Sequence, residues 1–208
     1  MDKILQRRIV PVAVIDDAAD AVPLAEALVA GGVDVIEVTF RTPAAEEAVR
    51  QIATRLPSVL VGAGTLLNPE QVRRALDAGA KFGVAPGLNE QVVLAAREMK
   101  LPFIPGVMTP SDVEKGLMLG CKLQKFFPAE AAGGVAMLKS LAGPYAHTGV
   151  KFIPLGGLTA GNMREYLALP VVAAIGGTWM TERSLIAGKQ WKKITELTAE
   201  AVRLAATM

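Results

Sequence analysis

The sequence predicts one (β/α)8 TIM barrel that occupies residues 1–208 as a single domain. Eight short runs rich in apolar and β-branched residues alternate with amphipathic segments along the whole chain. Successive runs start roughly 20–28 residues apart, the spacing of β-then-α units. Most of the runs also end in glycine or proline, which suits the turns at the carboxyl ends of barrel strands.

The expected elements follow from this alternation. The strands are expected at residues 9–15, 33–40, 58–64, 82–87, 102–107, 123–128, 151–157 and 171–177. The helices are expected at residues 18–30, 44–55, 69–78, 89–98, 111–119, 134–142, 160–168 and 189–205. A doubly wound open sheet is the alternative, but it rarely needs eight strands at such regular spacing. No linker or low-complexity tract divides the chain.

Composition and charge narrow the class of protein. Of 208 residues, 51% are hydrophobic and 20% are charged, and the formal net charge is only +2. This balance argues against binding to nucleic acid or to an anionic membrane. The apolar run after the basic start lasts only about six residues and no signal-peptidase site follows it. With a single cysteine, Cys121, which fits a reducing compartment, we expect a cytoplasmic protein.

Polar residues alternate with apolar ones along strand 33–40. One face is apolar and suits packing under helices, whereas the other carries Glu37, Thr39 and Arg41. The polar face is expected to point into the barrel, towards its carboxyl-terminal mouth, where barrel enzymes hold their active sites. The alternative is an internal Glu37–Arg41 ion pair, although four residues along a strand span about 13 Å.

A lysine also lies in an apolar strand. In "KLQKFFPAE", Lys125 shares a face with Leu123 and Phe127 and is expected to point inward. Burial penalises the ammonium form, and a neutral amine in a pocket attacks carbonyl carbon to form a Schiff base. Lys81 and Lys151 precede their strands, so they are expected at the opposite mouth.

The chemistry expected around Lys125 needs neither a metal nor an organic cofactor. One histidine, His147 in an expected loop, and one cysteine cannot supply the usual ligands of a catalytic zinc ion. An iminium on Lys125 would act as the electron sink instead. Glu37 is the best inward carboxylate for moving protons, Arg41 can clamp a substrate carboxylate, and Thr65 adds a hydroxyl.

Two glycine-rich strand ends predict a phosphate site. "PLGG" and "IGGT" end the seventh and eighth strands, where barrels commonly bind phosphate. Backbone N–H groups and one hydroxyl would hold the anion there. The residues concerned are Gly156, Gly157, Gly177 and Thr178.

With these residues in place, the chain resembles the bacterial 2-keto-3-deoxy-6-phosphogluconate (KDPG) aldolases, which often also act on 4-hydroxy-2-oxoglutarate (KHG). The similarity covers nearly the full length. Its motifs are "LVAGGVDVIEVTFRT", "VGAGTLLNPEQ", "APGLNE", "IPGVMTPSD", "KFFPAEAAGG", "GPY" and "GGTWM". The resemblance implies a homotrimer of (β/α)8 barrels that cleaves KDPG to pyruvate and glyceraldehyde 3-phosphate without metal or cofactor.

The resemblance also implies roles for individual residues. Lys125 would be the Schiff-base lysine and Glu37 the acid/base residue. The substrate contacts would come from Arg41 and Thr65 at the pyruvate carboxylate, Pro86 and Phe127 along the pocket wall, and Gly156, Gly157, Gly177 and Thr178 at the phosphate.

Two positions depart from the family pattern. The family commonly has threonine where this chain has Leu155, so a hydroxyl beside the substrate is replaced by an isobutyl group. Thr178 replaces the usual serine and keeps the hydroxyl. We therefore expect an altered preference, towards the C4 epimer 2-keto-3-deoxy-6-phosphogalactonate or a shorter unphosphorylated oxo acid.

Two other functions stay open at this point. A barrel phosphosugar isomerase or epimerase would use Glu37 as its base and would retain activity without Lys125. A catalytically inactive barrel would bind a phosphorylated sugar acid or serve as an oligomer scaffold. The combination of Glu37, Arg41 and Lys125 argues against the latter, because a binding protein has no need of a desolvated amine.

Overall fold

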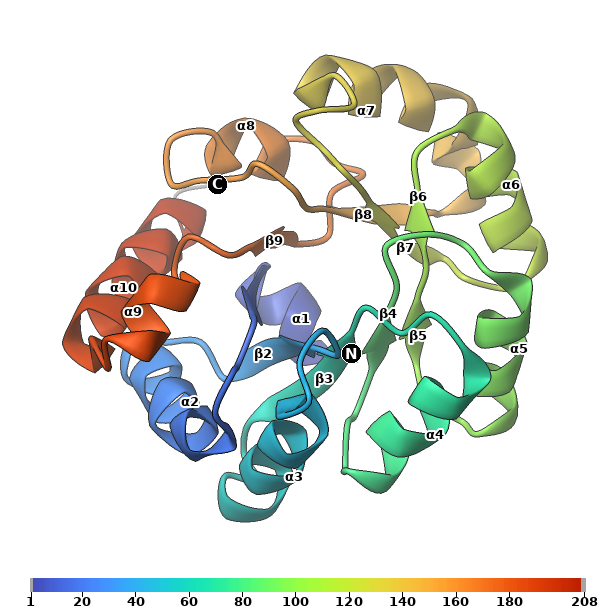
Figure 1. The fold of residues 1–208 in the computed structure, drawn as a ribbon. Helices are drawn as coiled ribbons and strands as arrows, with labels where there is room; N and C mark the ends of the chain where they lie inside the picture. The colour runs from blue at the N-terminus through green and yellow to red at the C-terminus, as the bar shows by residue number, and fades with distance from the viewer. Residues whose placement is uncertain (1, 207–208) are drawn as a thin grey trace.

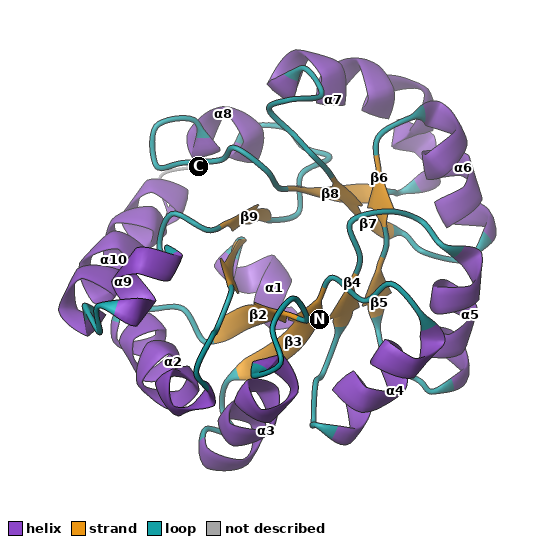
Figure 2. Ribbon diagram, in the orientation of Figure 1, coloured by secondary structure: helices purple, strands orange, loops and turns teal. Residues whose placement is uncertain are grey.

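The computed structural model describes residues 2–206 and has an α/β fold in which every pair of neighbouring strands is parallel. Six strands form one sheet in the order β5-β4-β3-β2-β1-β9, and three form a second in the order β6-β7-β8. Figure 1 shows the strands arranged around the middle of the molecule and the longer helices outside them, whereas α1 lies within the ring of strands. Figure 2 shows the same layering, with orange strands inside purple helices.

The bounds of the elements are close to those that the sequence predicts. The strands are β1 (Ile9–Ala13), β2 (Val35–Thr39), β3 (Leu60–Gly64), β4 (Gly83–Val84), β5 (Phe103–Ile104), β6 (Gly106–Val107), β7 (Leu123–Phe126), β8 (Lys151–Pro154) and β9 (Ile175–Gly177). The α-helices are α1 (Asp2–Arg7), α2 (Ala21–Ala30), α3 (Ala45–Arg55), α4 (Pro69–Asp77), α5 (Glu90–Glu98), α6 (Pro110–Met118), α7 (Gly134–Ala142), α8 (Met163–Leu167), α9 (Arg183–Ala187) and α10 (Trp191–Ala206). Two 3₁₀ helices are η1 (Ala18–Asp20) and η2 (Gly143–Thr148).

The strand predicted at 102–107 is two strands, because Pro105 interrupts it. Proline has no N–H group to donate to a neighbouring strand. β5 pairs with β4 and β6 pairs with β7, so the chain passes from one sheet to the other at Pro105. At the other side, a parallel bridge joins Phe152 in β8 to Val172, just before β9.

Three helical segments differ from the prediction. α1 was not expected, since only one of its residues, Ile4, is buried and its apolar periodicity is weak. The helix expected at 189–205 is α10, and the short helix α9, which lies before this range, was not expected. His147 was expected in a loop but lies in η2, where it is exposed.

Three clusters of apolar side chains fill the interior. Outward-facing strand residues pack under the helices, and Ile36 and Val38 of β2 do so beside α2 and α3. Inward-facing residues, among them Val10, Phe82 and Ile153, pack together with Ile4 of α1. The amino-terminal end of the strands is therefore closed by packed side chains, and any ligand must enter from the carboxyl-terminal end.

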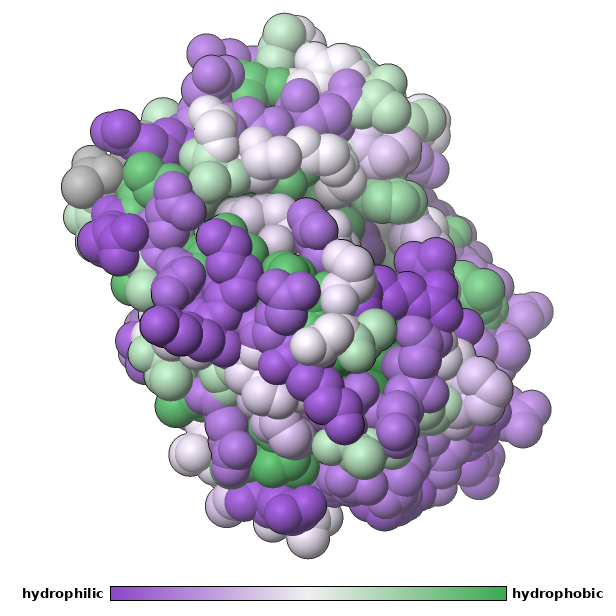
Figure 3. Space-filling model, turned by 60° about the vertical axis from the view of Figure 1, so that its left-hand side comes forward, coloured by the Kyte–Doolittle hydropathy of each residue, from purple (hydrophilic) through white to green (hydrophobic). Residues whose placement is uncertain are grey.

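One face of the molecule can be described by its hydropathy. Figure 3 shows hydrophilic side chains over most of the face it presents, with only scattered hydrophobic spots. Among the helices within residues 2–206, none is both long enough and apolar enough to cross a membrane.

Candidate active site

A cavity of about 200 Å³ opens at the carboxyl ends of the strands. Every site residue that the sequence predicts lines it: Glu37, Arg41, Thr65, Pro86, Lys125, Phe127, Leu155, Gly156, Gly157, Gly177 and Thr178. Three further lining residues, Val12, Thr39 and Leu158, were not predicted to contact substrate. Side chains from strands far apart in sequence therefore converge on one space.

β2 delivers Glu37 and Thr39 to the cavity. Both residues are buried, at 2% and 4% exposure, and they alternate with residues that face the helices. Thr39 Oγ1 donates a hydrogen bond to the carbonyl oxygen of Ala13 at 3.2 Å, which fixes its rotamer. Arg41 follows the strand at the cavity mouth and is exposed.

β7 delivers Lys125, which is only 6% exposed. Its backbone N–H donates to the carbonyl oxygen of Pro105 at 2.8 Å, and its strand neighbours are Gly106 and Ile153. Its Nζ lies 3.9 Å from Glu37 Oε1 and 4.9 Å from the centroid of the Phe127 ring. The amine therefore sits between a carboxyl group and an aromatic face, with little access to water.

The environment of Glu37 favours the protonated carboxyl group. Burial raises its pKa, and the nearby charge of Lys125 offsets this only in part. Its Oε1 accepts no hydrogen bond within the described chain. A carboxyl group whose pKa is raised in this way can act as a proton donor to a bound molecule and, once ionised, as a proton acceptor.

The alternative pairing of Glu37 with Arg41 is not found. Glu37 lies against Lys125, and Arg41 forms no ion pair with any residue in the range 2–206. The guanidinium at the cavity mouth is thus free to meet an anionic group of a ligand.

Gly64, a strand-end glycine that is not among the predicted site residues, makes room for Glu37. A methyl group added to Gly64 would place its Cβ 2.0 Å from Glu37 Oε1. Gly64 is the strand neighbour of Thr39 and ends β3. The only sequence signal was that glycines recur at positions 62 and 64, on one side of a strand.

Thr65, which follows Gly64, holds an unusual backbone conformation. Its φ is 59°, in the left-handed region that β-branched residues rarely adopt. Such conformations cost of order 1–3 kcal/mol and concentrate at functional sites. Here the conformation turns the chain so that Thr65 lines the cavity.

The far end of the cavity is formed by the loops after β8 and β9. Gly156 and Gly157 have φ values of 103° and 82°, so both need the conformational freedom of glycine. Gly177 and Thr178 complete this end. It is rich in backbone polar groups, as a phosphate site requires.

Leu155 forms an apolar wall between the two ends of the cavity. It is 7% exposed and packs on Gly176, where an added Cβ would lie 2.4 Å from Leu155 Cδ1. Together with Glu37 and Lys125 it also borders a small enclosed space of about 10 Å³ beneath the main cavity, roughly the room of one water molecule. The side chain of Leu155 has no hydroxyl group that could hydrogen-bond with a ligand at this position.

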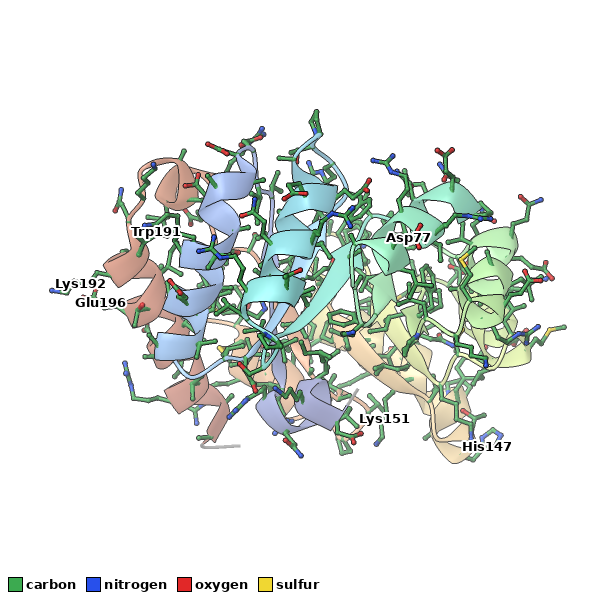
Figure 4. All side chains as sticks on the ribbon, turned by 90° about the horizontal axis from the view of Figure 1, so that it is seen from below. Asp77, His147, Lys151, Trp191, Lys192 and Glu196 are labelled. Carbon is green, nitrogen blue, oxygen red and sulfur yellow. The ribbon has the colours of Figure 1, made fainter. Side chains whose placement is uncertain are left out.

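Other candidate groups lie outside the cavity. Figure 4 shows Lys151 at the edge of the molecule, and its Nζ donates to the carbonyl oxygen of Pro170 at 2.8 Å. Cys121 is partly buried, and burial raises the pKa of its thiol. Within residues 2–206 no three side chains of His, Cys, Asp or Glu are grouped so that they could hold a metal ion.

Residues 1–197 match the family model described as KDPG and KHG aldolase. The KHG/KDPG aldolase of Escherichia coli K12 is 47% identical over 194 residues, covering 93% of this chain and 90% of the relative. The 2-dehydro-3-deoxy-phosphogluconate aldolase of Haemophilus influenzae is 43% identical over 202 residues, covering 97% and 94%.

Solved structures give the same picture. The KDPG aldolase of Legionella pneumophila, with pyruvate captured at low pH as a covalent carbinolamine intermediate, superposes with a TM-score of 0.92 at 42% identity, covering 96% of each chain. A KDPGal structure superposes with a TM-score of 0.86 at 24% identity, covering 96% of each chain, a likeness that speaks for the fold alone.

Proposed function

Because the chain belongs to the KDPG and KHG aldolase family, we propose that it is a class I aldolase that cleaves 2-keto-3-deoxy-6-phosphogluconate to pyruvate and glyceraldehyde 3-phosphate. A second substrate would be 4-hydroxy-2-oxoglutarate, cleaved to pyruvate and glyoxylate. The observation that carries the proposal is the buried Lys125 amine, 3.9 Å from the buried carboxyl group of Glu37, inside the cavity.

The proposed reaction begins at Lys125. Its neutral Nζ attacks the C2 carbonyl carbon of the substrate, and loss of water from the carbinolamine gives a protonated Schiff base. Glu37 supplies the proton for the departing hydroxide and then, as carboxylate, takes the proton of the C4 hydroxyl. The C3–C4 bond breaks, its electrons pass into the iminium to form an enamine, and the aldehyde leaves. Protonation at C3 by Glu37 and hydrolysis release pyruvate and restore the amine.

The remaining lining residues would bind and orient the substrate. Arg41 and Thr65 would hold the pyruvate carboxylate at one end, supported by the absence of a carboxylate partner for Arg41 among residues 2–206. Pro86 and Phe127 would line the wall, and the phosphate would meet Gly156, Gly157, Gly177 and Thr178 at the other end. Fixing both charged ends orients C2 towards Lys125.

Leu155 favours a second candidate substrate, the C4 epimer 2-keto-3-deoxy-6-phosphogalactonate. An apolar wall beside Glu37 and Lys125 withholds a hydrogen bond from a substrate hydroxyl, so discrimination at C4 is expected to weaken or reverse. The test compares kcat/KM on both epimers and on 4-hydroxy-2-oxoglutarate, for the wild type and Leu155→Thr. We expect the ratio between epimers to change about tenfold or more, as the loss or gain of one hydrogen bond implies. Identical ratios in the two proteins would refute the role of Leu155.

The proposal extends to architecture. We propose that residues 1–208 form one domain in which the two sheets act as a closed (β/α)8 barrel, supported by the chain passing between them at Pro105 and by the Phe152–Val172 bridge. The family resemblance supports a homotrimer, and the single cysteine fits a cytoplasmic location. Light scattering of the purified protein tests the trimer.

A further inference from the structure

A buried phenol on α8 reaches the loop that follows β7. Tyr166 is fully buried, and its Oη donates a hydrogen bond to Glu130 Oε1. Burial and the adjacent Glu130 carboxylate raise the pKa of Tyr166, so the phenol stays a donor throughout the working pH range of a protein. Glu130 itself is largely exposed, and neither residue lines the cavity.

Glu130 also touches the loop after β8. Its backbone N–H donates to the carbonyl oxygen of Gly156 at 3.0 Å. Its side chain lies across Gly157, because a Cβ added there would come within 2.7 Å of both Glu130 Cβ and Cγ. The carboxylate end of the side chain is therefore anchored by Tyr166 while its stem covers the glycine.

The residue just before α8 also holds this loop. Asn162 Nδ2 donates to the carbonyl oxygen of Gly157 at 3.1 Å, and Asn162 Oδ1 accepts from the backbone N–H of Thr159 at 2.8 Å. The Gly156–Gly157 segment thus lies between Glu130 and the start of α8. The Tyr166–Glu130 hydrogen bond connects these two supports.

We propose that Tyr166 and Glu130 are positioning residues that hold the Gly156–Gly157 backbone in the conformation that receives the substrate phosphate. This inference rests on the proposed function, since it concerns the phosphate end of that same site. Both glycines have left-handed φ values, and a flexible segment of this kind needs outside contacts to keep one conformation. The pair acts through the backbone and touches no reacting atom.

The test is Tyr166→Phe, which removes the donor and keeps the buried ring. We expect about a tenfold rise in KM for 2-keto-3-deoxy-6-phosphogluconate, the effect of one charge-assisted hydrogen bond, with kcat little changed. The dissociation constant of inorganic phosphate, followed by ³¹P NMR, should rise in parallel. The pyruvate concentration that half-saturates borohydride trapping should stay at the wild-type value, because pyruvate carries no phosphate.

Glu130→Gln keeps an acceptor oxygen and should retain most of the wild-type affinity, so its KM should stay near the wild-type value. Glu130→Ala should behave like Tyr166→Phe.

The chain offers a matched control. Tyr145 Oη also donates to a carboxylate, Glu114 Oε1 at 2.9 Å, but this pair is on the surface and away from the cavity. Tyr145→Phe should leave KM, kcat, phosphate affinity and pyruvate trapping unchanged.

Unchanged phosphate affinity in both Tyr166→Phe and Glu130→Ala would overturn the inference. A loss of pyruvate affinity equal to the loss of phosphate affinity would overturn it as well. If Tyr166→Phe does not fold, Glu130→Ala alone decides. Absence of any pyruvate adduct in the wild type would refute the proposed function instead, while the phosphate titration would still decide the positioning role.

Discussion

The carboxyl group of Glu37 is buried away from water, and this burial affects how the free energy of unfolding depends on pH. Burial raises its pKa despite the neighbouring Lys125. The folded protein therefore keeps the Glu37 proton at pH values where the unfolded chain, with a glutamate pKa of about 4.3, has released it. The folded state binds more protons in this window, so the free energy of unfolding falls as pH rises.

The first prediction concerns this pH window. The free energy of unfolding of the wild type should decrease from about pH 4 up to the raised pKa of Glu37, by as much as about 1.4 kcal/mol per pH unit. Glu37→Gln has no ionisable carboxyl group at this position, so its free energy of unfolding should lack this pH-dependent decrease. Urea unfolding of both proteins between pH 4 and pH 8 gives the two free energies of unfolding as functions of pH. The same pH dependence in both proteins would contradict this prediction.

The second prediction concerns the space beside Glu37. Gly64→Ala forces the Glu37 carboxyl group to move, since the new Cβ would lie 2.0 Å from its Oε1. A displacement of about 1 Å at the reacting atoms should lower kcat about a hundredfold. Gly143→Ala is the control, because nothing lies within 4 Å of its added Cβ. Equal kcat values for the two variants would show that Glu37 needs no such exact placement.

At the level of single residues, strand alternation predicted which side chains enter the cavity, because period-two patterns are local. It did not predict Gly64, whose role depends on a side chain from the neighbouring strand. The Glu130–Tyr166 bond joins residues 36 positions apart, and no local pattern signals such a contact. The left-handed backbone of Thr65 also contradicts its intrinsic preference and is imposed by the surrounding fold.

Among the elements, α6 has the most complete amino-terminal cap. Asp112 accepts hydrogen bonds from the backbone N–H groups of Met108 and Thr109 at 3.1 and 2.8 Å, and Thr109 Oγ1 accepts from the N–H of Asp112. Burial opposes ionisation of Asp112, but the bonds from Thr109 and Met108 outweigh it and lower its pKa. The cap therefore fixes the start of a helix directly after β6, beside the site strand β7.

The third prediction follows from this cap. Asp112→Ala should lower the free energy of unfolding by about 1 kcal/mol at pH 7. A carboxylate with a lowered pKa stabilises the fold above its unfolded pKa, so the difference from wild type should shrink as pH falls through the folded value. Ser111→Ala, at the exposed neighbouring position, is the control. A difference that does not change between pH 7 and pH 2 would contradict the ionic contribution.

Residues at the starts of helices and prolines within strands also explain how well the bounds of the helices and strands could be predicted. The helices expected to begin at positions 69 and 111 begin at Pro69 and Pro110, within one residue of the prediction. Pro105 splits a strand because it lacks a donor, an effect the apolar pattern did not reveal. α1 was missed because its single buried residue, Ile4, owes its burial to inward-facing strand residues rather than to its own periodicity.

At the scale of the whole molecule, an α/β fold in which parallel strands alternate with helices was predictable, because each strand and each helix has its own local pattern. The convergence of all predicted site residues on one cavity follows from parallel strands whose carboxyl ends meet. The division into a six-stranded and a three-stranded sheet was not predictable, since it depends on how strand edges meet in space.

We infer that the burial of Lys125 prepares its amine to form a Schiff base, and trapping of the adduct is the decisive experiment. The protein is treated with pyruvate and sodium borohydride, digested, and mapped by mass spectrometry. Lys151→Arg, at the opposite end of the molecule, is the control variant and should react like the wild type. We expect one pyruvate-derived adduct on Lys125 in the wild type, which should lose its cleavage activity on this treatment. We expect no adduct in Lys125→Ala. An adduct on another lysine, or cleavage that persists in Lys125→Ala, would contradict this inference.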